Sequence, residues 1–483
     1  MDLAVDLSRR GDRATAVYRA LLDAIRSGRL APGDRVPPTR ALAADLGVAR
    51  STVATAYESL VAEGFLASRV GSGTFVTDLA AAVPASPKGA ELRPRRGWTH
   101  LSAPVSGQAT TPAHDFRVGI PEAGLFPFET WRALLAAEVR AGAHSPGTYA
   151  DPGGHPPLRA AIARYLALSR GVGADPEDVL VTHGTQQALD LVTRVLLEPG
   201  DVVAVEDPGY PSAHAVFSAH GARVVPVPVD REGLVVDALP DRARLVFTTP
   251  SHQFPLGPPL SADRRRALLA WATPRRAAVV EDDYDSEFRF TERPMETLHA
   301  LDRSGLVVYV GTFSKSLVPG LRAGYVVAPP TLRQALRGAR QLADGFGALP
   351  EQAALARFVS DGQLARHLRR ARQVYAERRA LLVEGLATLV GDRLELVDSA
   401  AGLHVTALAT EPCLDDVGLA RDAADQGVAV DALSTYSLDG RGPSGLVLGY
   451  GAARTDSITP GLRRLARLLE RRPGGASTTV RRR

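Results

Sequence analysis

Short runs rich in valine alternate with helix-like segments through the middle of the chain. These runs lie at 178–182, 202–206, 223–229, 245–249, 277–281 and 306–310. A short run that is apolar throughout is typical of a strand buried on both faces, and strands that alternate with helices join as a parallel sheet. We therefore predict an α/β fold, with helices on both faces of a mostly parallel sheet.

The chain of 483 residues is longer than one ordinary domain, and its sequence changes character along its length. Residues 1–76 predict a small helical unit, and residues 77–114, rich in Pro, Ala, Ser and Gly, are typical of a linker. We assign 115–470 to a large domain, in which an arginine-rich helix and short strands such as 403–408 predict a small C-terminal α+β lobe. Residues 471–483 are expected to be a flexible basic tail.

The composition of the chain indicates where the protein is found and which kinds of site it can form. The chain is 45% hydrophobic and 23% charged, values that are typical of globular proteins, and its N-terminus lacks the layout of a signal peptide. No apolar run approaches the ~20 residues of a membrane span, so we expect a cytoplasmic protein without a membrane partner. Cys413 is the single cysteine, so one chain can build neither an internal disulfide nor a thiolate metal cluster. We expect no metal site.

The N-terminal unit has the pattern of a winged helix-turn-helix. An amphipathic helix is predicted at 14–27, Thr39 can cap a second helix, and Gly47 permits the turn into a third helix that starts near Arg50. Residues 64–76 then alternate around a glycine-rich tip, as in a tight hairpin.

The segment GRLAPGDRVPPTRALAADLGVARSTVATAYESLVAEGFLASRVGSGTFV resembles the DNA-binding unit of GntR-type bacterial regulators. Arginine can form bidentate contacts with guanine or phosphate, and hydroxyls at a helix N-terminus can contact phosphate oxygens. Composition alone leaves a protein-interaction module open, because residues 1–76 hold 10 Lys and Arg against 8 Asp and Glu, a net charge of only +2. The resemblance implies that double-stranded DNA is contacted by Arg40, Arg50, Ser51, Thr52, Arg69, Ser72 and Gly73.

Lysine occurs only at positions 88 and 315, and asparagine does not occur. Lys88 falls in the predicted linker, whereas Lys315 follows a predicted strand and has hydroxyl neighbours at Thr312, Ser314 and Ser316. A Schiff-base lysine needs a partly dry, positively biased site that lowers its pKa. We expect Arg322 to supply that bias and to bind a phosphate.

Further motifs follow other predicted strands, and each has two interpretations. Thr185 and Gln186 start a helix where a phosphate can bind, although an ordinary capped turn has the same pattern. Tyr210 can stack on a planar cofactor or simply belong to the core. Asp282 ends a buried strand and can pair with a pyridine nitrogen, or belong to a solvated acidic cluster or a metal site. Tyr149, in a loop before a helix, can reach a phosphate.

In this order the motifs resemble fold type I pyridoxal 5'-phosphate (PLP) aminotransferases over 115–470, and the whole chain resembles MocR-type GntR regulators. The resemblance implies that Lys315 carries PLP and that Asp282 faces its pyridine nitrogen. It also implies a homodimer in which Tyr149 acts on the other subunit. The remaining implied contacts are Tyr284 to the ring hydroxyl, Tyr210 as the stacking ring, and Thr185, Gln186, Thr312 and Arg322 to the phosphate.

Two positions depart from the aminotransferase pattern. The usual Asn-Pro-Xaa-Gly turn reads Ser-His-Gln-Phe-Pro-Leu-Gly at 251–257, so Phe254 replaces the asparagine and His252 and Gln253 remain as donors to the cofactor. The arginine that usually clamps the substrate carboxylate two residues before a glycine is Val447. Arg441 and Arg454 are near in sequence, and we expect them to be surface charges.

We therefore predict a transcription regulator that senses PLP, or an amino compound reacting with it, rather than an enzyme. The alternative is an active PLP-dependent aminotransferase with an accessory N-terminal domain. The absent arginine favours the regulator, with at most residual transaminase activity, because catalysis on an amino acid needs its carboxylate held in place. A third hypothesis is a sensor of PLP alone.

Overall fold

The computed structural model describes residues 13–78, 93, 98, 112–140, 149–290, 296–399, 401–411 and 414–472. The chain divides into two compact units, Met1–Pro94 and Arg95–Arg483. Most of the predicted linker (77–114) and of the predicted basic tail (471–483) lies outside the described residues.

The first unit is a three-helix bundle with a two-stranded antiparallel hairpin. Val17 and Leu21 of the first helix pack with Val53 and Leu60 of the third, and all four side chains are almost wholly buried. The elements are α1 (Arg13–Arg26), α2 (Thr39–Leu46), α3 (Arg50–Ala62), β1 (Leu66–Arg69) and β2 (Gly73–Val76). The predicted winged helix-turn-helix is confirmed.

The start of α2 differs from the prediction in one detail. Pro38 occupies the cap position in an extended conformation with ψ 142°, and Thr39 is the first helical residue. No side chain caps this helix, so the predicted cap by Thr39 is wrong. The Pro38 carbonyl accepts instead from the backbone N–H groups of Ala41 and Leu42, since the rigid proline already directs the chain into the helix. At the other end, Gly47 adopts φ 63°, which lets the chain turn sharply into α3.

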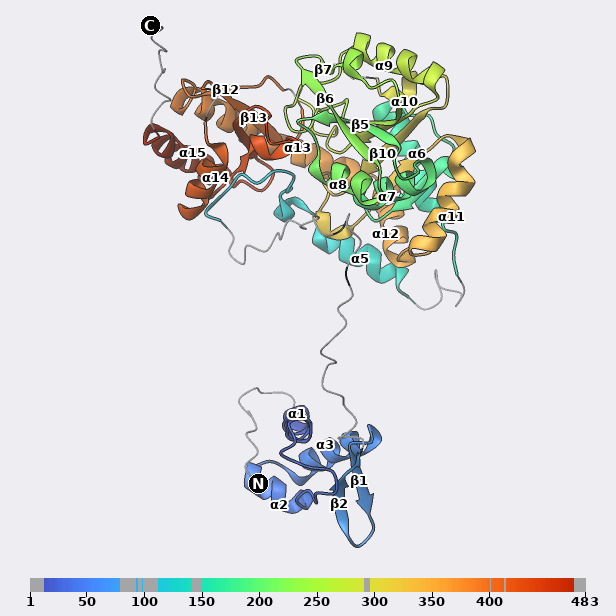
Figure 1. Ribbon diagram of the computed structural model, residues 1–483, viewed down its shortest axis with the longest axis vertical. Coiled ribbons are helices and arrows are strands. Elements are labelled where there is room, and N and C mark those ends of the chain that lie inside the picture. Colours follow the sequence, from blue (N-terminus) through green and yellow to red (C-terminus); the bar gives the residue numbers. More distant parts are fainter. Residues whose placement is uncertain are drawn as a thin grey trace. The chain divides into compact units, whose positions relative to one another are not determined.

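The second unit is built on an eight-stranded sheet whose order is β4-β11-β10-β9-β8-β5-β6-β7. Figure 1 labels β5, β6, β7 and β10 of this sheet. The strands β11 and β7 are antiparallel to their neighbours and the others are mutually parallel. All six valine-rich runs form strands of this sheet. The bounds are β4 Val179–Thr182, β5 Val202–Asp207, β6 Arg223–Asp230, β7 Gly233–Leu234, β8 Ala243–Thr248, β9 Ala278–Asp283, β10 Val307–Thr312 and β11 Gly324–Val327.

Helices cover both faces of this sheet because alternate residues of each strand point into separate cores. In β10, Val308 and Val310 pack with α7, α8 and α11, while Val307 packs with α9 and α10 and Tyr309 packs with α6 and α12. The helices are α5 Phe128–Glu138, α6 Pro156–Arg170, α7 Thr185–Leu196, α8 Pro211–Ala219, α9 Ala262–Arg275, α10 Leu298–Leu301, α11 Arg333–Ala343 and α12 Leu349–Ser360.

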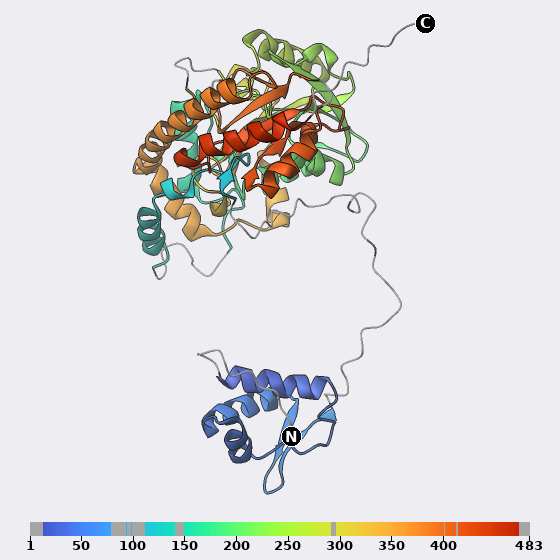
Figure 2. The same cartoon turned by 90° about the vertical axis from the view of Figure 1, so that its left-hand side faces the viewer.

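The C-terminal part forms the predicted α+β lobe, seen in orange and red in Figure 2. Its antiparallel sheet has the order β12-β13-β16-β15, and β14 pairs in parallel with β3. The elements are β3 His114–Asp115, α13 Gln363–Leu389, β12 Leu394–Leu396, β13 His404–Ala409, α14 Asp416–Asp425, β14 Val428–Ala429, β15 Asp431–Ala432, β16 Gly445–Gly449 and α15 Thr455–Glu470.

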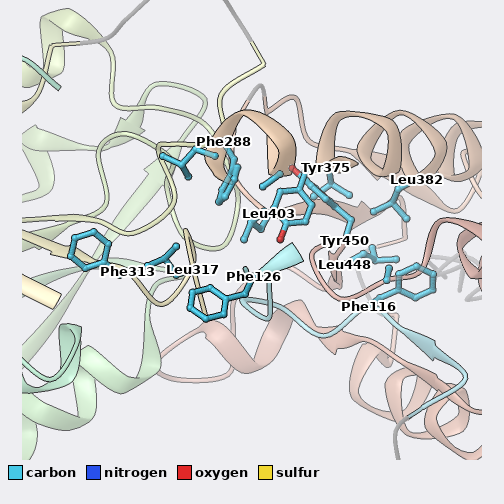
Figure 3. Packing of buried hydrophobic residues seen from close by; sticks show 14 of the residues in the cluster. Phe116, Phe126, Phe288, Phe313, Leu317, Tyr375, Leu382, Leu403, Leu448 and Tyr450 are labelled. Carbon is cyan, nitrogen blue, oxygen red and sulfur yellow. The ribbon is translucent and has the colours of Figure 1, made fainter. Parts of the chain in front are cut away.

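One hydrophobic core joins the large domain to the small lobe. Phe313 and Leu317, which flank Lys315, belong to the same buried cluster as Leu403 and Leu448 of the small lobe (Figure 3). The two lobes therefore share a core beside the segment that carries the candidate lysine.

Candidate functional site

The candidate residues follow strands that end at one edge of the large sheet. The strands β4, β5, β8, β9 and β10 are mutually parallel, so their carboxyl ends meet at this edge. Ligands of open α/β sheets bind at such an edge.

Lys315 follows β10, and its amine donates a hydrogen bond to the carbonyl oxygen of Gly119 at 2.7 Å. Burial lowers the pKa of this amine, while the nearby carboxylates of Asp285 and Asp282 oppose the shift. The pKa is therefore shifted in the direction that a Schiff-base lysine needs. The partly dry surroundings that the sequence predicted are therefore present, whereas burial and not the charge of Arg322 lowers the pKa.

Asp282 lies at the end of β9 and is 3% exposed. Its Oδ1 atom is buried and has no hydrogen-bond partner in the described structure. Burial, with a contribution from Asp283, raises the pKa of Asp282 to about 8, and the Lys315 amine opposes this shift. An unpartnered buried carboxylate is costly, and a cationic ligand group at this position would remove that cost.

Tyr284, two residues further on, contacts His252 of the 251–257 turn. Its hydroxyl donates to the His252 carbonyl at 3.1 Å and lies 3.0 Å from His252 Nδ1. The same Nδ1 lies 3.1 and 3.2 Å from the two carboxylate oxygens of Asp285. Asp285 and Tyr284 therefore hold the imidazole, which connects the 251–257 turn to the segment that follows β9.

His404 of the small lobe lies beside His252 and Asp285. His404 at the start of β13 lies with its ring centroid 4.7 Å from that of His252, and its Nε2 lies 2.9 Å from the Pro255 carbonyl oxygen. One potential ligand atom each from His252, Asp285 and His404 lies within 4.8 Å of the others. Both histidines already use a ring nitrogen in the hydrogen bonds given above, and these bonds join the turn, β9 and β13.

Tyr210 lies on the turn that follows β5. Its hydroxyl accepts a hydrogen bond from Gln186 Nε2 at 3.1 Å, and its ring meets Phe254 edge-on with centroids 5.7 Å apart. Phe254 also meets the edges of Tyr284 and Tyr436. The residue at the place of the usual asparagine therefore lies among aromatic rings.

The side-chain amide of Gln253 is hydrogen-bonded at both ends. Its Nε2 donates to the carbonyl oxygens of Pro208 at 2.9 Å and Phe254 at 2.7 Å and lies 3.3 Å from a Glu206 oxygen, while its Oε1 accepts from Leu256 N at 3.0 Å. The structure thus engages both ends of this amide within the turn instead of bringing it into the open site. The predicted cofactor contact by Gln253 would require these bonds to break.

The proposed phosphate-binding residues gather where β4, β10 and β11 meet. Thr185 is the first residue of α7, after Gly184 with φ 80°, and Arg322 donates to the His183 carbonyl at 2.6 Å. Thr312 ends β10, and its hydroxyl accepts from the Ser314 backbone N–H at 3.1 Å. This end of the site combines a helix N-terminus with an arginine and hydroxyls, a combination that suits a phosphate.

Tyr149 is not brought to this group within one chain. Its side chain is 91% exposed. The prediction that it acts on another subunit remains a prediction.

The structure adds residues that sequence reasoning missed. Asp283 accepts hydrogen bonds from Arg170 at 2.7 Å and Tyr309 at 2.5 Å, and Arg170 also donates to Ser251 at 2.8 Å. Gly119 is missing from the predictions as well, although a Cβ there would lie 2.6 Å from Lys315 Nζ. Only the proximity of Asp283 to Asp282 along the chain could have indicated this network, because its other members are more than 25 residues away.

In the first unit, the predicted DNA contacts lie at three places on its surface. Arg40 is exposed on α2, and Arg50, Ser51 and Thr52 form the first turn of α3, where Arg50 and Ser51 are exposed. The remaining predicted contacts, Arg69, Ser72 and Gly73, lie at the hairpin tip, where Gly73 has φ 112° and packs against Arg35. Arg35, which pairs with Phe75 of β2, was not predicted.

Two protein families match the chain: residues 13–76 match the gntR family of bacterial regulatory proteins and residues 116–455 match aminotransferase class I and II. The probable rhizopine catabolism regulatory protein MocR of Rhizobium meliloti is 40% identical over 457 residues, which cover 93% of this chain and 92% of that protein. The chain belongs to the MocR-type regulators of the GntR family.

Other relatives agree with this membership. The pyridoxine biosynthesis transcriptional regulator PdxR of Corynebacterium glutamicum is 34% identical and covers 89% of this chain and 90% of its own length. The solved structure of LysN, the α-aminoadipate aminotransferase of Thermus thermophilus, is 33% identical with a TM-score of 0.68, covering 74% of this MocR-type chain and 91% of LysN. The fold and family predicted from the sequence are confirmed, and PLP is the cofactor of the aminotransferase-like domain. Within the described residues, no helix has both the length and the apolar character to cross a membrane.

Proposed function

We propose that this MocR-type regulator binds operator DNA through α3 and the β1–β2 hairpin, and that PLP on Lys315 is the group through which it senses a small molecule. The observation that carries the proposal is that a partly buried lysine, whose pKa is lowered, lies at the same sheet edge as the buried carboxylate of Asp282, whose Oδ1 has no hydrogen-bond partner among the described residues. An amine that is easily deprotonated and a carboxylate that lacks a cation are the two groups that PLP requires.

The chain offers a partner for each part of PLP. Asp282 would pair with the pyridine nitrogen, and a cationic nitrogen there would favour the ionised form of this carboxyl group, whose pKa burial raises. Tyr210 would stack on the ring, and Tyr284 together with His252 would bind the ring hydroxyl. Thr185, Gln186, Thr312 and Arg322 would hold the phosphate. Bound PLP supplies an electrophilic carbon for a primary amine and a ring that accepts electrons.

The regulatory step requires that a ligand bind two states of the protein with different affinity. The relatives point to two kinds of input, since PdxR is a pyridoxine biosynthesis transcriptional regulator and MocR is a probable rhizopine catabolism regulatory protein. We infer that this chain responds to PLP itself or to an amino compound that reacts with it. We place the regulator in the cytoplasm, as a homodimer in which Tyr149 of one subunit reaches the phosphate of the other.

The test uses the full-length protein and the DNA immediately upstream of its own gene. Fluorescence anisotropy should show specific binding, and addition of PLP should change the dissociation constant. Arg50→Ala should weaken binding while the visible absorbance of PLP is retained. Lys315→Ala should bind DNA but lose the response to PLP. The regulatory proposal fails if the protein shows no sequence-specific binding with or without PLP, and transaminase turnover in that protein would favour the enzyme instead.

A further inference from the structure

One face of the small-lobe sheet forms a wall that packs against the 251–257 turn, near Lys315. In the register of this sheet, Val447 lies directly opposite Thr406 on one side and Asp431 on the other. Residues directly opposite one another in an antiparallel sheet share a face, and so do His404 and Thr406, which are two apart on one strand. His404 Nε2 lies 2.9 Å from the Pro255 carbonyl oxygen, and Thr406 Oγ1 lies 2.6 Å from it, so this face lies against the 251–257 turn.

The charged group on this face is a carboxylate. Asp431 Oδ2 accepts from the backbone N–H of Val118 at 3.2 Å and from the Tyr436 hydroxyl at 3.0 Å. Val118 immediately precedes Gly119, whose carbonyl accepts from the Lys315 amine, and the Tyr436 ring lies 5.2 Å from that of Phe254. Asp431 is therefore bonded to the backbone next to Gly119 and to Tyr436, whose ring lies beside Phe254. Both of these hydrogen bonds end on Oδ2, so Oδ1 can accept from a ligand.

The cations that accompany this wall are already engaged. Arg117 interacts electrostatically with Asp431, but its guanidinium is joined to Asp115 by two hydrogen bonds of 2.8 and 2.6 Å. Arg322 donates to the His183 carbonyl at the phosphate end of the site. The position opposite Asp431, where an arginine would meet a ligand carboxylate, holds the fully buried Val447. A ligand carboxylate at this wall would therefore meet the like charge of Asp431, while the Arg117 guanidinium is held by Asp115 and the position opposite Asp431 supplies no cation.

We infer that the amino compound sensed by this chain is a primary amine without a carboxylate, and that it carries a hydroxyl or second ammonium group that donates to Asp431. This inference rests on the proposed function. The amine end lies toward Lys315 and the donor end toward the small lobe. Such a ligand bridges the large domain and the small lobe, so its binding can alter how the two lobes pack.

The test compares amines that differ at one end only. PLP-loaded full-length protein is titrated with 1,4-diaminobutane, 4-aminobutan-1-ol and 4-aminobutanoate, and binding is followed by the change in PLP absorbance. We expect the diamine and the amino alcohol to bind at least about tenfold more tightly than the amino acid. Equal or tighter binding of 4-aminobutanoate overturns the inference, and so does the absence of any response to all three amines.

Substitutions of Asp431 and Val447 test whether these two residues cause the ligand preference. Asp431→Asn keeps the shape and an oxygen for Val118 and Tyr436, and should reduce the preference for the diamine over 4-aminobutanoate to less than about threefold. Val447→Arg should shift the preference toward 4-aminobutanoate. An unchanged preference in folded Asp431→Asn, judged by its PLP absorbance, contradicts the assignment. Operator binding is measured on the same samples. If the wild-type protein does not bind operator DNA, the proposed function is refuted. If it binds operator DNA but prefers 4-aminobutanoate to the diamine, only this inference is refuted.

Discussion

Replacement of Arg170 by methionine should destabilise the large domain, and the loss should grow with pH. Arg170 is the last residue of α6, and its guanidinium joins Asp283 at 2.7 Å and Ser251 at 2.8 Å. The side chains of Arg170 and Asp283 are only 8% and 1% exposed. Asp283 follows Asp282 directly in the sequence, and its ion pair with Arg170 ties α6 to the end of β9, while the bond to Ser251 ties α6 to the 251–257 turn.

The expected loss in the free energy of unfolding arises because Arg170→Met leaves the Asp283 carboxylate without its cation. Removing one partner of a buried ion pair costs about 3–5 kcal/mol, because the other charge stays buried without compensation. Asp283 keeps the hydrogen bond from the Tyr309 hydroxyl at 2.5 Å, and methionine replaces most of the apolar stem of the arginine. We therefore expect a loss near the lower end of that range, about 3 kcal/mol at neutral pH.

The pH dependence has a definite sign. Burial alone would raise the pKa of Asp283, but Arg170 and Tyr309 outweigh it and hold the pKa below its usual value. In the wild-type protein this group therefore contributes stability above its unfolded pKa, and the contribution is lost as the pH falls through the folded pKa. In Arg170→Met burial prevails and the pKa lies above its usual value, so that variant loses stability as the pH rises. The two proteins should differ least near pH 4 and most at neutral pH.

Urea unfolding followed by tryptophan fluorescence measures this difference selectively, because Trp98, Trp131 and Trp271 all lie in the second unit. Arg164→Met on the exposed side of the same helix is the matched control and should change the free energy of unfolding by less than about 0.5 kcal/mol. If Arg170→Met matches that control near pH 8, or loses the same stability near pH 5 and pH 8, the reasoning is refuted.

Four further changes test the other parts of the molecule. Lys315→Ala should abolish the visible absorbance of bound PLP, and a retained band would contradict the assigned lysine. Asp282→Asn should weaken PLP binding, measured by absorbance titration; unchanged affinity would show that this carboxylate does not face the ring. Arg50→Ala should weaken operator binding by about 1–3 kcal/mol in anisotropy titrations, and wild-type affinity would remove Arg50 from the interface. Leu60→Ala, in the core of the first unit, should cost about 2–5 kcal/mol by circular dichroism on thermal unfolding, whereas a loss below 1 kcal/mol would contradict its burial.

The order of strands and helices could be predicted from the sequence, because it depends on local patterns of apolar residues, glycine and proline. The strands β5, β8, β9 and β10 are buried on both faces, so their runs of valine and other apolar residues mark them without knowledge of their neighbours. The glycine at 47 ended α2 as predicted, since its φ of 63° favours glycine. The cap of α2 was wrong because Pro38 alone sets the direction of the chain there.

The site was only partly readable. Lys315 could be chosen because one other lysine exists, at position 88 in the predicted linker. Its contacts could not be predicted, because Gly119, which accepts its hydrogen bond, is 196 residues away. The predicted effect of Arg322 on its pKa was wrong, since burial lowers that pKa. Gln253 had the right chemistry for a cofactor contact, but tertiary contacts engage both ends of its amide.

The sequence by itself therefore determined which segments form strands and helices and which lysine can carry a cofactor, since both depend on residue type and spacing. Only the tertiary structure decided which charges surround that lysine. It placed the carboxylates of Asp285 and Asp282 near Lys315 and the cation of Arg170 against Asp283, across separations of 30, 33 and 113 residues. Charges interact through space, and the distances that govern them exist only after the chain has folded.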